Sequence, residues 1–129
     1  PKWLAGYANR FLNEHDVERR VAVEQFDEQE QLIASIKNHL LAESPVIALV
    51  NYTPLAWHYV VLIRHDAHQN RFSYLDTNGH IYPISEEELV NLMDFHRQRT
   101  TKMLQKTLQS IGWPLSVDIG RFNLITWAE

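Results

Sequence analysis

Two apolar segments, residues 46–51 and 58–63, constrain the fold of this chain more than any other feature of its sequence. Both are rich in the β-branched and aliphatic residues that favour strands. A third such segment, residues 72–75, follows after the short polar run 64–71, which must contain a turn. We therefore expect three consecutive antiparallel strands joined as hairpins.

The spacing of His58 and Asp76 along these strands predicts a contact between a histidine and an acid. Opposing residues in an antiparallel pair have a constant sum of residue numbers. A turn centred on Ala67 places His58 opposite Asp76. A turn centred on His68 instead places it opposite Asn78. Because side chains alternate between faces, His58, Asp76 and Asn78 share one face in either register. Opposed Cβ atoms lie about 4.5–5.5 Å apart, which is within reach of an imidazole–carboxylate hydrogen bond.

This pairing has a catalytic and a structural interpretation. A histidine held by a carboxylate has a fixed tautomer and raised basicity, as the base for a thiol or hydroxyl nucleophile requires. The structural alternative is that residues 76–79, Asp-Thr-Asn-Gly, simply make a good turn. Spacing alone leaves both interpretations open, because a motif needs its geometric context.

The motifs around this pair resemble those of a known family. Segment 44–50, then His-Tyr-Val-Val at 58–61, then Leu-Asp-Thr-Asn-Gly at 75–79, resembles the C39-like branch of the papain-like cysteine peptidases. The resemblance extends from Trp3 to Leu92 and includes Ser85 at the start of an acidic helix. It implies an α+β fold in which helices pack on an antiparallel sheet.

The resemblance also assigns roles to the candidate site. It implies that His58 is the general base and Asp76 its orienting acid, and Asn78 is the third candidate residue of this catalytic site. Thr77 departs from the family pattern, because proline is usual at this position.

The chain contains no cysteine, which is the decisive departure from the family. A thiolate is the nucleophile of such peptidases, so the chain as given should be inactive as a cysteine peptidase. Family members carry that cysteine at the start of a helix upstream of the matched region. Two hypotheses follow: a fragment or subunit of a thiol hydrolase, or a degenerate domain that binds a peptide or protein without cleaving it. Thr53 and Ser73 are poor substitute nucleophiles, and Ser73 should face away from His58.

Composition narrows the remaining function classes. At 129 residues the chain can form one core, and we expect a single domain over residues 1–129, or the C-terminal part of a larger one. A net charge of −4 argues against nucleic-acid binding, and no apolar stretch is long enough for a membrane span. We expect no cofactor and no metal, because the residues near the turns that could ligate one lack metal-site spacing. Those residues are His65, Asp66, His68 and His80.

Other elements are predicted from periodicity and capping signals. We expect an amphipathic helix over residues 2–14 and a short strand at 21–23. The residues expected on the buried face of the helix are Leu4, Tyr7, Ala8 and Phe11. Asp27 with Glu30 predicts a capping box for a helix that ends near Glu43.

The C-terminal third should contain one more helix and the last strands. Ser85 with Glu88 predicts a second capping box, for a helix that runs, with or without a break, towards Ser110. Gly112 and Pro114 should stop it, and one or two strands should follow between residues 115 and 127.

The sheet itself should need cover that this chain does not supply. In the family the cysteine helix packs across the sheet, and segments 46–51 and 58–63 are apolar on both faces. We expect the face that carries His58 to be incompletely covered. A second copy, a partner or an N-terminal segment should then complete it.

Overall fold

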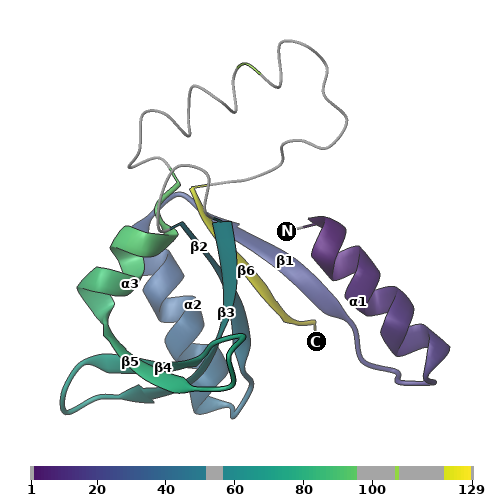
Figure 1. Ribbon diagram of the computed structural model, residues 1–129, viewed down its shortest axis with the longest axis horizontal. Helices are drawn as coiled ribbons and strands as arrows, with labels where there is room; N and C mark the ends of the chain where they lie inside the picture. The colour runs from purple at the N-terminus through teal and green to yellow at the C-terminus, as the bar shows by residue number, and fades with distance from the viewer. Residues whose placement is uncertain (1, 52–56, 96–106, 108–120, 129) are drawn as a thin grey trace.

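The computed structural model describes residues 2–51, 57–95, 107 and 121–128, and its centre is a six-stranded sheet (Figure 1). The strand order is β1-β6-β2-β3-β4-β5, and every neighbouring pair is antiparallel. The strands are β1 Val21–Phe26, β2 Val46–Asn51, β3 Trp57–Asp66, β4 Arg71–Leu75, β5 Ile81–Ser85 and β6 Phe122–Trp127. The helices of the described residues are α1 Lys2–Glu14, α2 Gln29–Leu41 and α3 Glu86–Met93. The predicted fold class, α+β with helices packed on an antiparallel sheet, is confirmed.

The central hairpins have a register that the sequence could not specify uniquely. His58 lies opposite Val50 in β2, and Val61 lies opposite Leu75 in β4. The register between β3 and β4 shifts by one residue after Leu62, as in a β-bulge. From Val61 to Leu62, before this shift, the register is the one expected for a turn centred on His68. If β4 continued beyond Leu75, this register would place His58 opposite Asn78.

One face of the sheet is covered by α2 and α3, which Figure 1 shows on the same side. Val60 and Leu62 of β3 are buried there against Leu32 and Ile36 of α2. Val60 and Leu62 lie two and four residues after His58, so all three side chains are on the same face of the sheet. The face that carries His58 is therefore well covered along β3. The prediction of an incompletely covered face is therefore wrong, because both helices pack on this same side.

Helix α1 forms as predicted, but its buried face is rotated from the expected one: of the four expected residues, Leu4 and Ala8 are half-buried there beside Ala5. The helix lies against β1 at the edge of the sheet, and Ala5 is its buried residue. Asn9 fixes this orientation: its Nδ2 donates to the carbonyl oxygen of Val21 at 2.9 Å, and Val21 N donates to Asn9 Oδ1 at 2.7 Å. Tyr7 and Phe11, expected to be buried, are 61% and 53% exposed. The apolar face of α1 is wider than the single strand it packs against.

The two predicted capping boxes have opposite outcomes. At α3, Glu88 N donates to Ser85 Oγ at 3.1 Å, so the predicted N-cap is confirmed, while the Glu88 carboxylate accepts at 3.1 Å from the Ser85 hydroxyl and not from the backbone N–H that a full capping box uses. At α2 the N-cap is Glu28, without a side-chain hydrogen bond, so the box predicted at Asp27 is wrong. Residues 27–28 form a bend after β1 that places the helix start one position later.

Two further features lie after β4. Helix α3 ends at Met93, because Asp94 is extended, which is compatible with the break that the sequence allowed. The predicted continuation towards Ser110 and the stop at Gly112 and Pro114 fall on residues 96–120, of which the structure describes only Thr107. Strand β5 was not predicted, since Pro83 interrupts its pattern. It is tolerated because β5 is the edge strand of the sheet. In the described part of the chain, no helix combines the length and apolar character needed to cross a membrane.

Candidate functional site

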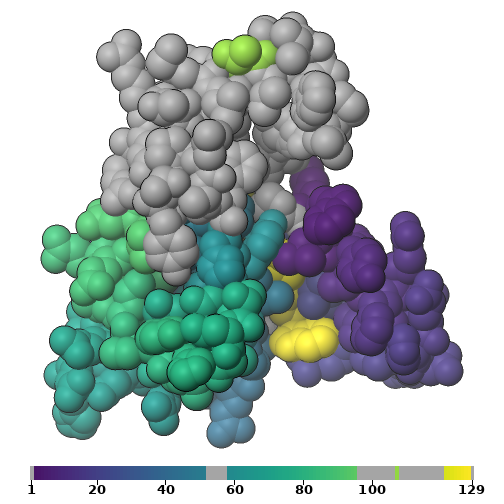
Figure 2. Space-filling model, viewed as in Figure 1, coloured from purple at the N-terminus to yellow at the C-terminus, as the bar shows by residue number. Residues whose placement is uncertain are grey.

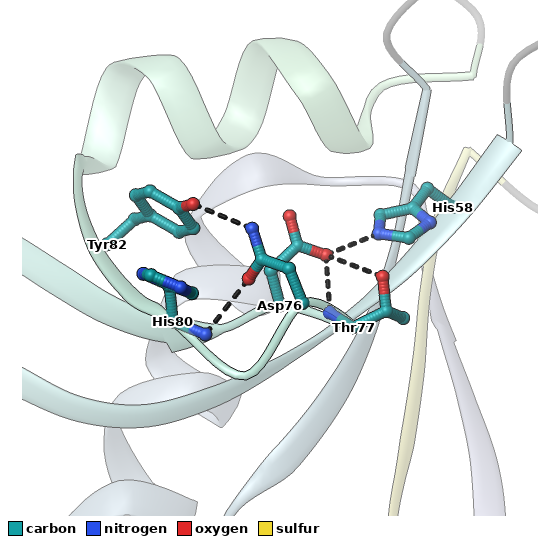
Figure 3. A network of polar contacts seen from close by, with 6 residues as sticks. His58, Asp76, Thr77, His80 and Tyr82 are labelled. Atoms are coloured by element: carbon teal, nitrogen blue, oxygen red, sulfur yellow. Dashed lines mark hydrogen bonds and ion pairs between the residues drawn. The ribbon is translucent and has the colours of Figure 1, made fainter.

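His58 and Asp76 meet at one end of the central strands, as predicted (Figure 3). His58 lies near the start of β3, and Asp76 directly follows β4. The distance from His58 Nε2 to Asp76 Oδ1 is 2.6 Å. The side chains are 30% and 20% exposed, so the pair is accessible from solvent yet held by its surroundings. The geometric prediction is confirmed, while a catalytic role for the pair stays a prediction.

A tight turn holds the carboxylate of Asp76 in place. Asp76 N donates to the carbonyl oxygen of His80 and Gly79 N donates to that of Asp76, both at 3.0 Å. Gly79 has a φ of 83°, a left-handed conformation that glycine adopts without the steric penalty of a Cβ. The turn therefore fixes the direction in which Asp76 points.

Thr77 adds a second hydrogen bond to the carboxylate. Its backbone N donates to Asp76 Oδ1 at 2.7 Å, and its Oγ1 lies 3.4 Å from the same oxygen. A proline at this position has no N–H and could not make the shorter contact. Threonine rather than proline at position 77 thus gives the acid an additional donor.

These contacts set the charge of the acid and the tautomer of the histidine. The hydrogen bond from His58, followed by the backbone N–H of Thr77, lowers the pKa of the Asp76 carboxyl below its ordinary value of 3.8. Because the ionised carboxylate can only accept, Nε2 of His58 carries a proton. In the neutral imidazole the basic lone pair is then on Nδ1. A nucleophile served by this histidine would have to approach Nδ1.

Asn78, the third predicted site residue, does not join the pair. Its Nδ2 donates to the hydroxyl of Tyr82 at 2.8 Å, and its Oδ1 accepts from the backbone N of His80 at 2.9 Å. The prediction that placed Asn78 beside His58 is corrected here, because the chain turns after Leu75 and directs Asn78 towards β5.

The structure does not support Ser73 or Thr53 as a substitute nucleophile. Ser73 lies opposite Arg64 and Pro83, and it alternates with the buried Phe72, whose side faces α2. It therefore faces away from His58, as expected. Thr53 lies outside the described residues. Among the described residues, no group of three or more His, Asp or Glu side chains is arranged to hold a metal ion.

A second histidine–carboxylate pair was missed by the sequence analysis. His39 Nε2 of α2 lies 2.9 Å from Glu24 Oε2 of β1. Ser35 Oγ donates to Glu24 Oε1 at 3.1 Å, and Thr126 Oγ1 donates to Glu24 Oε2 at 2.6 Å. The four residues come from three elements, β1, α2 and β6, and β6 is far from the other two in sequence. The only sequence signal was the spacing of Ser35 and His39, which puts both on one side of a helix.

Comparisons with known proteins add little to this geometry. No family model and no curated protein matches the chain, so they do not support assignment to the C39-like branch. Among solved structures, the crystal structure of the Pseudomonas avirulence protein AvrPphB is similar at a TM-score of 0.35 and 12% identity. The alignment covers 97% of this chain and 70% of that chain. A likeness this weak carries no argument about activity.

Proposed function

We propose that His58 and Asp76 are the base and orienting acid of a papain-like thiol hydrolase that cleaves peptide or amide bonds. The nucleophile would be a cysteine that is not part of this sequence. The observation that supports the proposal is the 2.6 Å contact between His58 Nε2 and the ionised carboxylate of Asp76. This contact orients the imidazole and supplies a fixed negative charge behind it.

The chemistry follows from the position of the proton. His58 Nδ1 takes the proton of the thiol, and the carboxylate of Asp76 stabilises the resulting imidazolium. The thiolate attacks the substrate carbonyl, and the tetrahedral intermediate collapses to a thioester as Nδ1 returns the proton to the leaving amine. Water activated by the same nitrogen then hydrolyses the thioester, which regenerates the thiol. Asp76 keeps its charge throughout.

A different class of function remains as the second candidate. The same fold could serve as a non-catalytic module that binds a peptide or protein, and the absence of cysteine in 129 residues favours this alternative. In that case the pair would be a structural contact at the end of the sheet. The two candidate functions predict different effects of replacing His58: only the hydrolase would lose catalytic turnover.

The test uses the protein expressed together with any coding sequence that precedes Pro1 in its gene. If that sequence supplies a cysteine at a helix start, an iodoacetamide probe should label it and a peptide library should be cleaved. His58→Ala should then lower turnover by about 10²–10⁴-fold. His68→Ala is the matched control, since His68 is exposed in the β3–β4 turn. Equal turnover in both variants would overturn the proposal.

The chain as given provides the complementary test. It should be neither labelled by the probe nor able to cleave peptides, because it has no thiol. Reproducible turnover that His58→Ala abolishes would demonstrate a hydroxyl or metal mechanism. That result would also overturn the thiol proposal.

A further inference from the structure

The turn that carries Asp76 lies at the surface, beyond the end of β4. Residues 77–80 are all exposed, and Figure 2 shows the teal-green atoms of this part of the chain on the outside of the molecule. Leu75 is the last residue of β4 that pairs in the sheet register. The direction of the Asp76 side chain therefore depends on the conformation of the turn. A contact that fixes this turn also fixes the acid of the candidate site.

Asn78 closes the turn with both ends of its side-chain amide. Its Oδ1 accepts from the backbone N of His80 at 2.9 Å, and its Nδ2 donates to the hydroxyl oxygen of Tyr82 at 2.8 Å. The first contact spans two residues and is the local hydrogen bond that favours asparagine in turns. The second contact reaches out of the turn to strand β5. An amide supplies the acceptor and the donors together, which a carboxylate cannot do.

Tyr82 gives the second contact a fixed anchor. It is half-buried, and its ring lies near that of Tyr74, directly opposite in β4, with the centroids 5.5 Å apart. Tyr74 packs in turn against the hydrophobic core. Figure 3 shows Tyr82 and His80 on one side of Asp76 and His58 on the other. The turn is thus tied to the sheet on the side opposite to His58.

We propose that Asn78 and Tyr82 are positioning residues for the pair of His58 and Asp76. Through the turn, their hydrogen bond holds the carboxylate of Asp76 at 2.6 Å from His58 Nε2. Both residues act on His58 through Asp76. The inference rests on the function proposed for His58 only in its effect on turnover, since the positioning itself can be measured in the chain as given.

The alternative is that this contact stabilises the turn without affecting the site. The turn also has backbone hydrogen bonds, from Asp76 N to the carbonyl oxygen of His80 and from Gly79 N to that of Asp76, and these need no side chain. If they alone set the direction of the acid, loss of the anchor lowers stability and nothing else. Positioning predicts in addition that the carboxylate moves away from His58 Nε2, so that the tautomer with the proton on Nε2 is less favoured.

Nitrogen-15 NMR of the chain as given measures the tautomer of His58 directly. Tyr82→Phe removes the acceptor of Asn78 and keeps the ring. The ratio of the Nδ1–H to the Nε2–H tautomer should therefore rise by about 2–10-fold, the range expected for the loss of one hydrogen bond. Asn78→Ala removes both contacts of the amide and should give a larger rise. In both variants the carboxyl of Asp76 should titrate closer to its ordinary pKa of 3.8.

Matched controls separate this effect from a general loss of structure. Tyr7→Phe removes a hydroxyl from an exposed position on α1, and Asn91→Ala removes an amide from an exposed position on α3. Neither control should change the tautomer of His58. Urea denaturation confirms that each variant is folded, and Tyr82→Phe, the milder change, serves alone if Asn78→Ala is not. An unchanged tautomer and an unchanged titration of Asp76 in the folded variants would overturn the proposal.

Turnover tests whether the positioning matters for the reaction. In the protein expressed together with any coding sequence that precedes Pro1, Tyr82→Phe should lower kcat by about 2–10-fold with little change in KM. An altered tautomer with unchanged kcat would overturn the role of the two residues in catalysis. Turnover that survives His58→Ala would instead overturn the function proposed for the pair, while the NMR result would still decide the positioning.

Discussion

The molecule contains two histidine–carboxylate pairs that look alike in isolation and differ in their surroundings. His58–Asp76 and His39–Glu24 both use Nε2, at 2.6 and 2.9 Å, and all four side chains are between 20% and 33% exposed. Glu24 also accepts hydrogen bonds from two hydroxyls on other elements. Asp76 is held instead by the backbone and side chain of the residue next to it.

The comparison shows that the contact between histidine and acid does not by itself indicate catalysis. The Glu24 pair ties α2 to β1 and β6, so its partners are distributed over the fold. The Asp76 pair lies where β3 and β4 end, and its acid is set by a local turn. A pair at the end of a sheet can meet a substrate, whereas a pair that joins three elements stabilises them.

Glu24→Ala should have the largest effect on stability. It removes three hydrogen bonds, each worth about 0.5–1.5 kcal/mol net, so the free energy of unfolding should fall by about 2 kcal/mol after allowance for partial exposure. Urea denaturation followed by tryptophan fluorescence measures this. Glu18→Ala, at an exposed position, is the control. Asp76→Asn should cost less than Glu24→Ala, and equal losses would show that both pairs are structural.

Acid should weaken both pairs. Burial alone would raise the pKa of Glu24, but hydrogen bonds from Thr126, His39 and Ser35 together lower it below the ordinary 4.5. The pKa of Asp76 is also lowered. Near these values the unfolded chain binds more protons than the folded one, so stability is full above pH 4.5 and lost as pH falls through the lowered pKa values. As pH falls through this range, the midpoint of urea denaturation should decrease less steeply in Glu24→Gln than in the unmodified chain. An unchanged dependence on pH would contradict the lowered pKa of Glu24.

Thr77 offers the finest distinction, because only its backbone N–H makes the short contact to Asp76. Thr77→Pro removes that donor, so the pKa of Asp76 should rise towards its ordinary 3.8. Thr77→Val keeps the N–H and should leave the pKa lowered. Carbon-13 NMR titration of the carboxyl in both variants measures the difference. Equal shifts would assign the effect to the hydroxyl instead.

The sequence predicted the central hairpins and the meeting of His58 with Asp76, because alternation and a short turn restrict the register strongly. It did not predict the bulge after Leu62, which depends on how β3 packs, or strand β5, which Pro83 obscures. Asn78 was misplaced for a related reason: parity assigns a face only while the strand continues, and β4 ends at Leu75.

The sequence by itself determined the periodicity of most elements, the lack of a thiol and the pairing of His58 with Asp76. Such features are local, since they follow from residue type and spacing along the chain. Only the tertiary structure decided which face of α1 is buried and that Glu24 meets His39, Ser35 and Thr126. Those outcomes depend on contacts between different elements of the fold. The side-chain pattern of a segment indicates whether it forms a helix or a strand, but not which other elements it packs against.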